Sequence, residues 1–104
     1  MDLKQIIKDN KIVVAYFWGK GCKDCENYRP IFEQVEKELQ DVKFVKIDIT
    51  DHKIRTEMDE IISGKKNEKI IPRKPTTLLW RDGRPCKIEP GLLSAAFLRT
   101  WIKH

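Results

Sequence analysis

Two cysteines separated by two residues, in the segment Cys22-Lys23-Asp24-Cys25, are the residues of this sequence best suited to chemistry. Such a pair serves either as a reversible disulfide or as half of a metal site. It follows the strongly apolar run Ile12 to Trp18 and a Gly19-Lys20-Gly21 break, and it precedes apolar residues at helical spacing. We therefore expect Cys22 at the start of a helix, where free backbone amides and the helix dipole stabilise a thiolate.

The expected nucleophile is Cys22, because the thiolate is the reactive form of cysteine. Lys20 and Lys23 favour a thiolate at this position, whereas Asp24 opposes it. Cys25 lies three residues later on the same helical face, within reach for a disulfide, and is the expected resolving thiol. In this scheme Cys22 attacks a substrate disulfide, and Cys25 then attacks the mixed disulfide and releases the reduced substrate.

The alternative for the cysteine pair is half of a structural zinc site, which needs about four ligands. The remaining candidate ligands stand alone, since none of them is paired with another at ligand spacing: they are Cys86, His52 and His104. The sequence therefore favours redox chemistry, and we expect neither a metal nor an organic cofactor.

Length and hydropathy limit the kind of protein this can be. The chain has 104 residues, of which 40% are hydrophobic, so we expect a single soluble domain over residues 1–104. The longest strongly apolar run has 7 residues, whereas a membrane-spanning helix needs about 20. The first residues, Met1 to Lys8, lack the apolar core and cleavage site of a secretion signal, which predicts a cytoplasmic protein.

The first half of the chain predicts helices alternating with strands around the cysteines. A helix capped by Asp2 precedes a strand over residues 12–18, whose lack of polar alternation suits a central strand covered on both faces. A longer helix begins at Cys22 and contains Pro30, which should kink it. Residues 45–49 alternate between apolar and charged side chains, as a strand does.

The second half predicts one more helix, a hairpin and a last helix. Asp51 can cap a helix that ends at Ser63-Gly64, and Ser94 can cap the last helix. Strands over 76–80 and 84–88 flank an Asp-Gly pair, a strong hairpin signal. The resulting order, αβαβαββα, predicts an α/β fold with a mixed sheet, because crossover helices make the early strands parallel and the hairpin adds an antiparallel edge.

These features, in this order, resemble the thioredoxin family over nearly the whole chain. The residues that carry the resemblance are Phe17-Trp18, Cys22 and Cys25, Pro30, Lys74-Pro75-Thr76, Asp82-Gly83 and Gly91-Leu92-Leu93-Ser94. The resemblance implies a thioredoxin-like fold with four strands, in which the first strand of longer members is missing. It also implies a thiol-disulfide oxidoreductase that reduces protein disulfides and is reduced again by a reductase.

The resemblance further implies which residues bind the substrate. Lys74-Pro75-Thr76 is similar to the family's cis-proline segment, which lies against the cysteines and pairs with the substrate backbone. Pro75 would position the substrate with Thr76 as its backbone neighbour, and Gly91 would leave room for the bound chain. Lys74 and Gly21 are the other two residues expected to bind the substrate. Gly21 stands where the family usually has Trp.

Besides Gly21, the sequence departs from the family at two further places near the cysteines. Lys23-Asp24 replaces the usual Gly-Pro pair, and this dipeptide tunes the reduction potential. A disulfide oxidase or isomerase is therefore the alternative within the same class. Tyr16 falls where thioredoxins bury an acid that exchanges protons with the second cysteine, so proton transfer to Cys25 is expected to use water or the Tyr16 hydroxyl.

Positive charge is concentrated in the second half of a chain whose net charge is +5. Residues 63–74 contain five basic residues and one acidic residue. This segment is either a solvated loop or a docking surface for an acidic protein. The alternative function from another class is accordingly a binding module with incidental cysteines. Nucleic acid is not an expected partner, because the segment lacks interleaved aromatic residues, and we expect a monomer.

Overall fold

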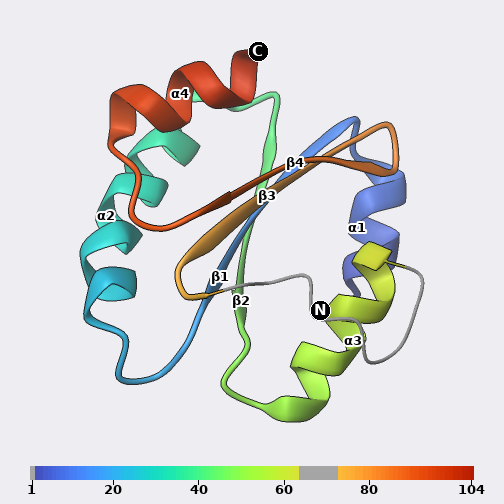
Figure 1. The fold of residues 1–104 in the computed structure, drawn as a ribbon. Helices are drawn as coiled ribbons and strands as arrows, with labels where there is room; N and C mark the ends of the chain where they lie inside the picture. The colour runs from blue at the N-terminus through green and yellow to red at the C-terminus, as the bar shows by residue number, and fades with distance from the viewer. Residues whose placement is uncertain (1, 64–72) are drawn as a thin grey trace.

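A computed structural model describes residues 2–63 and 73–104 of the chain, and these residues form a mixed sheet between two pairs of helices (Figure 1). The elements follow the order expected from the sequence. They are α1 (Leu3–Asp9), β1 (Ile12–Trp18), α2 (Lys23–Glu38), β2 (Lys43–Asp48), α3 (His52–Ser63), β3 (Thr76–Arg81), β4 (Arg84–Pro90) and α4 (Ala95–Lys103).

The four strands lie in the order β2-β1-β3-β4. β1 is parallel to β2, because α2 crosses over between them, and it is antiparallel to β3. β3 and β4 form the predicted hairpin, and positive φ angles of 53° at Asp82 and 81° at Gly83 make its turn. In the register, Phe17 near the end of β1 stands between Ile47 of β2 and Thr76 of β3.

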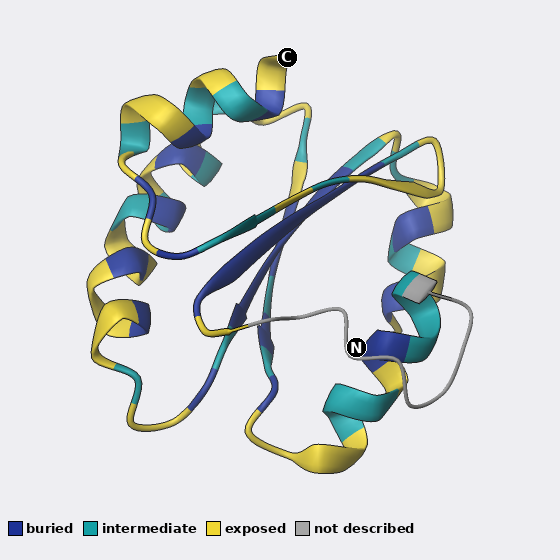
Figure 2. Ribbon diagram, viewed as in Figure 1, coloured by how far each residue is buried: buried dark blue, intermediate teal, exposed yellow. Residues whose placement is uncertain are grey.

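β1 contributes side chains to hydrophobic clusters on both faces of the sheet. Val13, Ala15 and Phe17 belong to the cluster that includes residues of α1 and α3, whereas Val14 and Tyr16 belong to the cluster that includes residues of α2 and α4. Figure 2 shows the central part of the sheet as buried. Each of the five is at most 1% exposed, which explains why the strand carries no polar alternation. The end of this fully covered strand leads directly to the cysteines.

The helix ends follow the predicted capping residues. The side chain of Asp2 accepts a hydrogen bond from the Gln5 amide, and Ser94 accepts one from the Phe97 amide. Asp51 accepts from the Lys53 amide at the start of α3. Pro30 lies inside α2, which remains helical on both sides of it.

Three strands differ from the predicted bounds. β3 ends at Arg81 rather than at residue 80. β2 begins at Lys43 rather than at residue 45, because its parallel pairing with β1 extends over Lys43 and Phe44, and it ends at Asp48 rather than at residue 49. β4 continues to Pro90, and its pairing with β3 shifts register between Leu79 and Trp80. Most of the basic segment 63–74 lies outside the described residues. No helix in the described part of the chain is long and apolar enough to cross a membrane.

Candidate functional site

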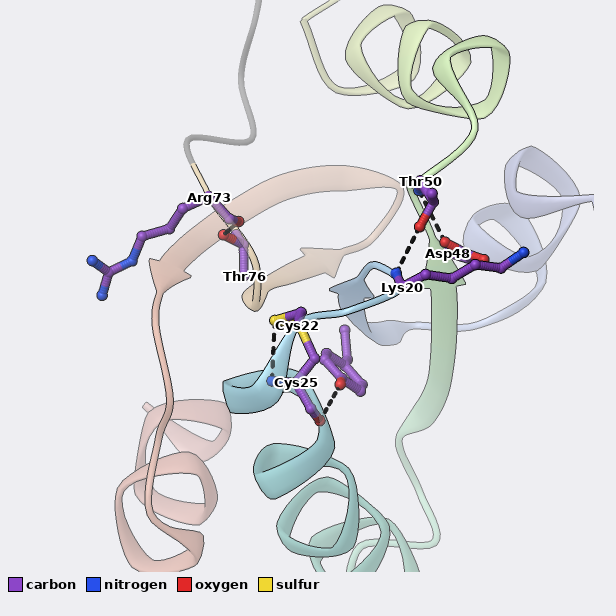
Figure 3. Close-up of a disulfide and its surroundings, with 8 residues drawn as sticks. Lys20, Cys22, Cys25, Asp48, Thr50, Arg73 and Thr76 are labelled. Atoms are coloured by element: carbon purple, nitrogen blue, oxygen red, sulfur yellow. Dashed lines mark hydrogen bonds between the residues drawn. A yellow bond between two sulfur atoms is a disulfide. The ribbon is translucent and has the colours of Figure 1, made fainter.

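The two cysteines of the motif form a disulfide at the junction of β1 and α2 (Figure 3). Cys22 is the N-cap of α2 and is partly exposed, whereas Cys25 lies in the first helical turn and is only 2% exposed. Their Cα atoms are 5.2 Å apart, a separation at which two cysteines can be bridged without backbone movement. One sulfur is thus open to a partner, and the other is hidden behind it.

The amino end of α2 stabilises negative charge on Cys22. The backbone N–H of Cys25 donates to the Cys22 Sγ at 3.2 Å, and α2 extends for 16 residues beyond the cap. A sulfur at this end meets free backbone amides and the positive end of the helix dipole. Asp24 and Glu26 in the first turn work against a thiolate.

Tyr16 is held beneath the disulfide by a hydrogen bond to the backbone of α2. Its hydroxyl donates to the carbonyl oxygen of Cys25 at 2.5 Å. Burial raises the pKa of Tyr16 to about 12; the charge of Arg29 opposes this shift and that of Glu33 adds to it. At neutral pH the hydroxyl is therefore protonated and donates to the carbonyl, a contact that the sequence did not indicate.

A second buried tyrosine joins α2 to β3. The hydroxyls of Tyr28 and Thr77 are 2.7 Å apart, and the two tyrosine rings meet edge to face with centroids 5.0 Å apart. Burial also raises the pKa of Tyr28, despite its hydrogen bond to Thr77. This contact fixes the helix that carries Cys25 against the strand that follows Pro75.

The segment before β3 contains the expected cis-proline. The Lys74–Pro75 bond is cis, and the buried Pro75 accepts a hydrogen bond from the Gly91 amide at 2.7 Å. The hydroxyl of Thr76 donates to the carbonyl oxygen of Arg73 at 2.5 Å. The structure thus brings Pro75, Thr76 and Gly91 together, next to the end of β1 that leads to the cysteines.

A cleft of about 440 Å³ opens beside the disulfide. It is lined by Tyr16, Trp18, Gly19, Lys20, Gly21, Cys22, Cys25, Glu26 and Arg29. Gly21 therefore lies with the cysteines, at a positive φ of 76°, whereas Lys74, Pro75, Thr76 and Gly91 do not line this cleft. Sequence reasoning missed Glu26 and Arg29, although their positions four and seven residues after Cys22 place them on the same helical face.

The loop that carries Lys20 is tied to the end of β2. The Lys20 amide donates to the Thr50 hydroxyl at 2.8 Å, and the Thr50 amide donates to Asp48 at 2.9 Å. The pKa of Asp48 is held below its usual range mainly by hydrogen bonds from Thr50, with help from the charges of Lys20 and Lys74. This network was not predicted from the sequence.

The other candidate ligands lie on elements other than β1 and α2. Cys86 is exposed on the edge strand β4, His52 is the first residue of α3, and His104 is the C-cap of α4. Within residues 2–63 and 73–104, no three side chains of the His, Cys, Asp and Glu types gather in a way that could hold a metal ion.

Sequence comparisons with known proteins match this chain over nearly its whole length. The family model for Thioredoxin matches residues 2–104. The thioredoxin of Mycoplasmoides gallisepticum is 30% identical over 102 residues, which cover 98% of this chain and 92% of that protein. The thioredoxin of Rickettsia typhi is 28% identical over 99 residues, with coverage of 94% and 85%.

Solved structures agree with the sequence matches. The oxidised mitochondrial thioredoxin 3 of Saccharomyces cerevisiae has a TM-score of 0.78 at 24% identity, over 98% of this chain and 86% of that chain. Fasciola hepatica thioredoxin has a TM-score of 0.78 at 25% identity, over 98% and 89%. These matches confirm the predicted thioredoxin-like fold.

Proposed function

Since the chain belongs to the thioredoxin family and is a thiol-disulfide oxidoreductase of the protein-disulfide reductase type, we propose that Cys22 is its nucleophile and Cys25 its resolving thiol. The observation that supports this assignment is the difference between the two sulfurs. Cys22 is partly exposed and accepts the Cys25 amide at the amino end of α2, whereas Cys25 is buried. Only Cys22 is placed to meet an external disulfide.

The proposed reaction transfers two electrons and two protons to the substrate. The Cys22 thiolate attacks one sulfur of the substrate disulfide, which forms a mixed disulfide and releases the other sulfur as a thiolate. Cys25 then loses its proton and attacks the Cys22 Sγ, which releases the second substrate thiolate. The two substrate thiolates take up two protons from solvent, which received one from Cys25 in this step and one from Cys22 when its thiolate formed. The substrate thus ends as two thiols, and the enzyme ends with the Cys22–Cys25 disulfide that the structure contains.

The proton of Cys25 leaves through the cleft in this proposal. The Tyr16 hydroxyl already donates to the Cys25 carbonyl, and its raised pKa keeps it protonated at neutral pH, so it does not accept the proton. The proton therefore passes to water in the cleft, which Cys25 and Tyr16 both line.

We further propose that the cis-proline segment and Gly21 bind the substrate chain. Pro75 and Thr76 are held in place by hydrogen bonds to Gly91 and Arg73, so this edge is set before a substrate arrives. Gly21 lies in the cleft beside Cys22. Gly91 lacks a side chain, and the guanidinium of Arg73 takes up the space where one would stand.

A trapping experiment tests the roles of the two cysteines. In a Cys86→Ser background, Cys25→Ser should accumulate a mixed disulfide with a peptide disulfide substrate, because the second attack is lost. Cys22→Ser should form none and should lose all turnover. The adduct is measured by non-reducing mass spectrometry. Equal trapping by both single variants would contradict the assignment.

The reduction potential distinguishes a reductase from an oxidase or isomerase. We expect a value near or below about −230 mV, as in reductants of this class, rather than about −180 to −120 mV. The Cys86→Ser protein is equilibrated with glutathione mixtures, and its free thiols are counted by mass spectrometry. A value in the higher range would assign electron flow in the opposite direction.

The remaining parts of the proposal concern the whole protein. We propose a single domain over residues 1–104 that acts as a cytoplasmic monomer and is recycled by a reductase, without metal or organic cofactor. The exposed Arg73 and Lys74 are the described cations of the basic segment 63–74. A binding module with incidental cysteines would keep its partner after Cys22→Ser, so the trapping variants also test that alternative.

A further inference from the structure

Arg73 and Lys74, the two cations that precede Pro75, each have a side chain that lies against a glycine. A Cβ atom at Gly91 would stand 2.6 Å from the Arg73 Nη2. A Cβ atom at Gly19 would stand 2.6 Å from the Lys74 Cδ and 2.7 Å from its Nζ. Gly19 lines the disulfide cleft, and the Gly91 amide donates a hydrogen bond to the Pro75 carbonyl oxygen. Lys74 therefore lies at the edge of the cleft, and Arg73 lies beside the cis-proline segment.

We propose that Arg73 and Lys74 select protein disulfides whose neighbouring residues are acidic. This inference rests on the proposed function, because it names the substrate class of the same cysteines. A carboxylate beside a substrate disulfide would meet one or both cations as the disulfide reaches Cys22. Attraction between opposite charges raises the rate of encounter and fixes orientation.

The backbone around the two cations is fixed on both sides. The Arg73 carbonyl accepts from the Thr76 hydroxyl, and the Pro75 carbonyl accepts from the Gly91 amide. Figure 3 shows Arg73 and Thr76 at the start of β3 on one side of the disulfide, with Lys20 and Asp48 on the other. The cations are therefore carried by a segment whose position relative to Cys22 is set by the sheet.

The charge of Arg73 is available to a substrate. Lys46 pairs with Glu33 and Arg99 pairs with Glu38, whereas neither Arg73 nor Lys74 forms an ion pair with another residue of the ranges 2–63 and 73–104. Lys74 lies close enough to Asp48 to help lower the pKa of that carboxyl. The negative charge of Asp48 therefore weakens the attraction of Lys74 for a substrate carboxylate. A guanidinium also binds a carboxylate through two parallel hydrogen bonds. Arg73 should therefore contribute more than Lys74.

Other charges near the disulfide do not cancel this attraction. Three carboxylates stand close by, namely Asp24, Glu26 and Asp48. The neighbouring segments also carry three further cations, namely Lys20, Lys23 and Arg29. With Arg73 and Lys74 added, cations outnumber carboxylates among these described residues, which favours an acidic partner over a basic one.

Single-turnover kinetics with three peptides test the proposal. Each peptide carries one internal disulfide and differs only in the residues beside the reactive cysteines, which are Glu, Gln or Lys. The reduced full-length protein, with Cys86→Ser, is mixed with each peptide at low salt. The reaction is stopped with acid, and peptide thiols are counted by mass spectrometry to give a second-order rate constant.

We expect the wild-type site to reduce the Glu peptide faster than the Lys peptide. Arg73→Gln should lower the Glu-to-Lys rate ratio by about 2- to 5-fold, the range of a single exposed charge pair. Lys74→Gln should lower it less, and Arg73→Lys, which keeps the charge, should retain most of it. Added salt should reduce the wild-type ratio, because it screens exposed charges.

Arg84→Gln is the matched control for net charge. Arg84 is exposed at the start of β4 and pairs with Arg81, at the opposite end of β3 from Thr76 and about 17 Å away along the strand. An equal fall in the ratio for this variant and for Arg73→Gln would overturn the proposal, and so would a ratio that Arg73→Gln leaves unchanged. If all three peptides react equally, only this inference fails; if the Gln peptide is not reduced at all, the proposed function fails. Circular dichroism shows whether each variant is folded.

Discussion

Tyr16 and Tyr28 are the two tyrosines of the sequence, and both hydroxyls are used inside the molecule. Tyr16 donates to the Cys25 carbonyl, and Tyr28 shares a hydrogen bond with Thr77. Burial raises the pKa of each, to about 12 for Tyr16. Ionisation of either residue would place an uncompensated charge in the cluster beneath the disulfide.

An alkaline titration should show no tyrosinate near pH 10 while the protein is folded. The folded pKa of Tyr16 lies above its unfolded value of 10.0, so the stabilisation is fully present below pH 10 and is lost as the pH rises toward 12. We expect tyrosinate absorbance at 295 nm to appear only together with loss of the circular dichroism signal.

Comparison with Tyr16→Phe assigns the signal to residues. The variant retains Tyr28 alone, so its tyrosinate amplitude should halve in the alkali-unfolded state. Half of the wild-type absorbance change near pH 10, with the circular dichroism intact, would show that one tyrosine is accessible and would contradict this account.

At the scale of single residues, local motifs could be predicted and long-range contacts could not. Cys22, Cys25 and the cis bond at Pro75 follow from short segments with strong preferences or a family resemblance. The hydrogen bond from Tyr16 to the Cys25 carbonyl depends on how α2 lies over β1. The contact between the Arg73 side chain and Gly91 joins residues that are 18 positions apart in the sequence, and no local pattern indicates it.

The connection between β4 and α4 depends on Gly91. Its φ is +98°, a conformation that glycine adopts readily and other residues rarely. Its amide also holds the Pro75 carbonyl at 2.7 Å. The same residue thus sets the course of the chain into α4 and supports the cis-proline segment.

Gly91→Ala should lower the free energy of unfolding by about 1–2 kcal/mol, because the alanine must adopt a backbone conformation that is strained for a residue with a side chain. Urea unfolding followed by circular dichroism measures the change. Gly21→Ala is the control, since Gly21 also has a positive φ but has no neighbour within 4 Å of a built Cβ. A loss of similar size is expected there, without displacement of Arg73. An unchanged stability for Gly91→Ala would contradict the strain argument.

The packing of α4 against the sheet depends on its buried face. Leu98 is fully buried in the cluster on the side of α2, whereas its neighbour Phe97 is 46% exposed. Leu98→Ala should cost about 2–5 kcal/mol of unfolding free energy, because it leaves a cavity in a packed core. Phe97→Ala on the same helix should cost far less. Chemical denaturation of both variants gives the comparison, and equal losses would be inconsistent with the burial described here.

At the scale of elements, bounds were predictable where local chemistry sets them. The predicted limits of β1 are those of the structure, and the helix caps lie at Asp2, Asp51 and Ser94 as expected. β2 begins earlier than its alternation indicates, because pairing with β1 recruits Lys43 and Phe44. Phe44 is covered by Phe32 of α2, with ring centroids 5.2 Å apart, a contact absent from the local pattern.

In the whole molecule, three strands join the two hydrophobic clusters. β1, β2 and β3 each contribute side chains both to the cluster that contains Met58 of α3 and to the cluster that contains Leu98 of α4, and β1 contributes the most. Damage to either cluster is therefore expected to affect the other through these shared strands. The fold should behave as one cooperative unit.

Met58→Ala and Leu98→Ala should each lower the midpoint of a single unfolding transition. Circular dichroism reports the helices, and fluorescence reports the tryptophans, including the buried Trp80. The two probes should give coincident curves for both variants. Separate transitions for the two faces of the sheet would show that the clusters unfold independently.

The central position of β1 also has a consequence for the timescale of motion next to the disulfide. Its backbone is paired on both sides and covered on both faces, so its amide protons should exchange with solvent only through opening of the whole sheet. Gly21, three residues beyond its end, is exposed. The exchange rate of the amide protons should therefore rise by orders of magnitude between Phe17 and Gly21. Cys22 thus lies next to a short segment that opens rapidly, whereas the strand before that segment opens only slowly.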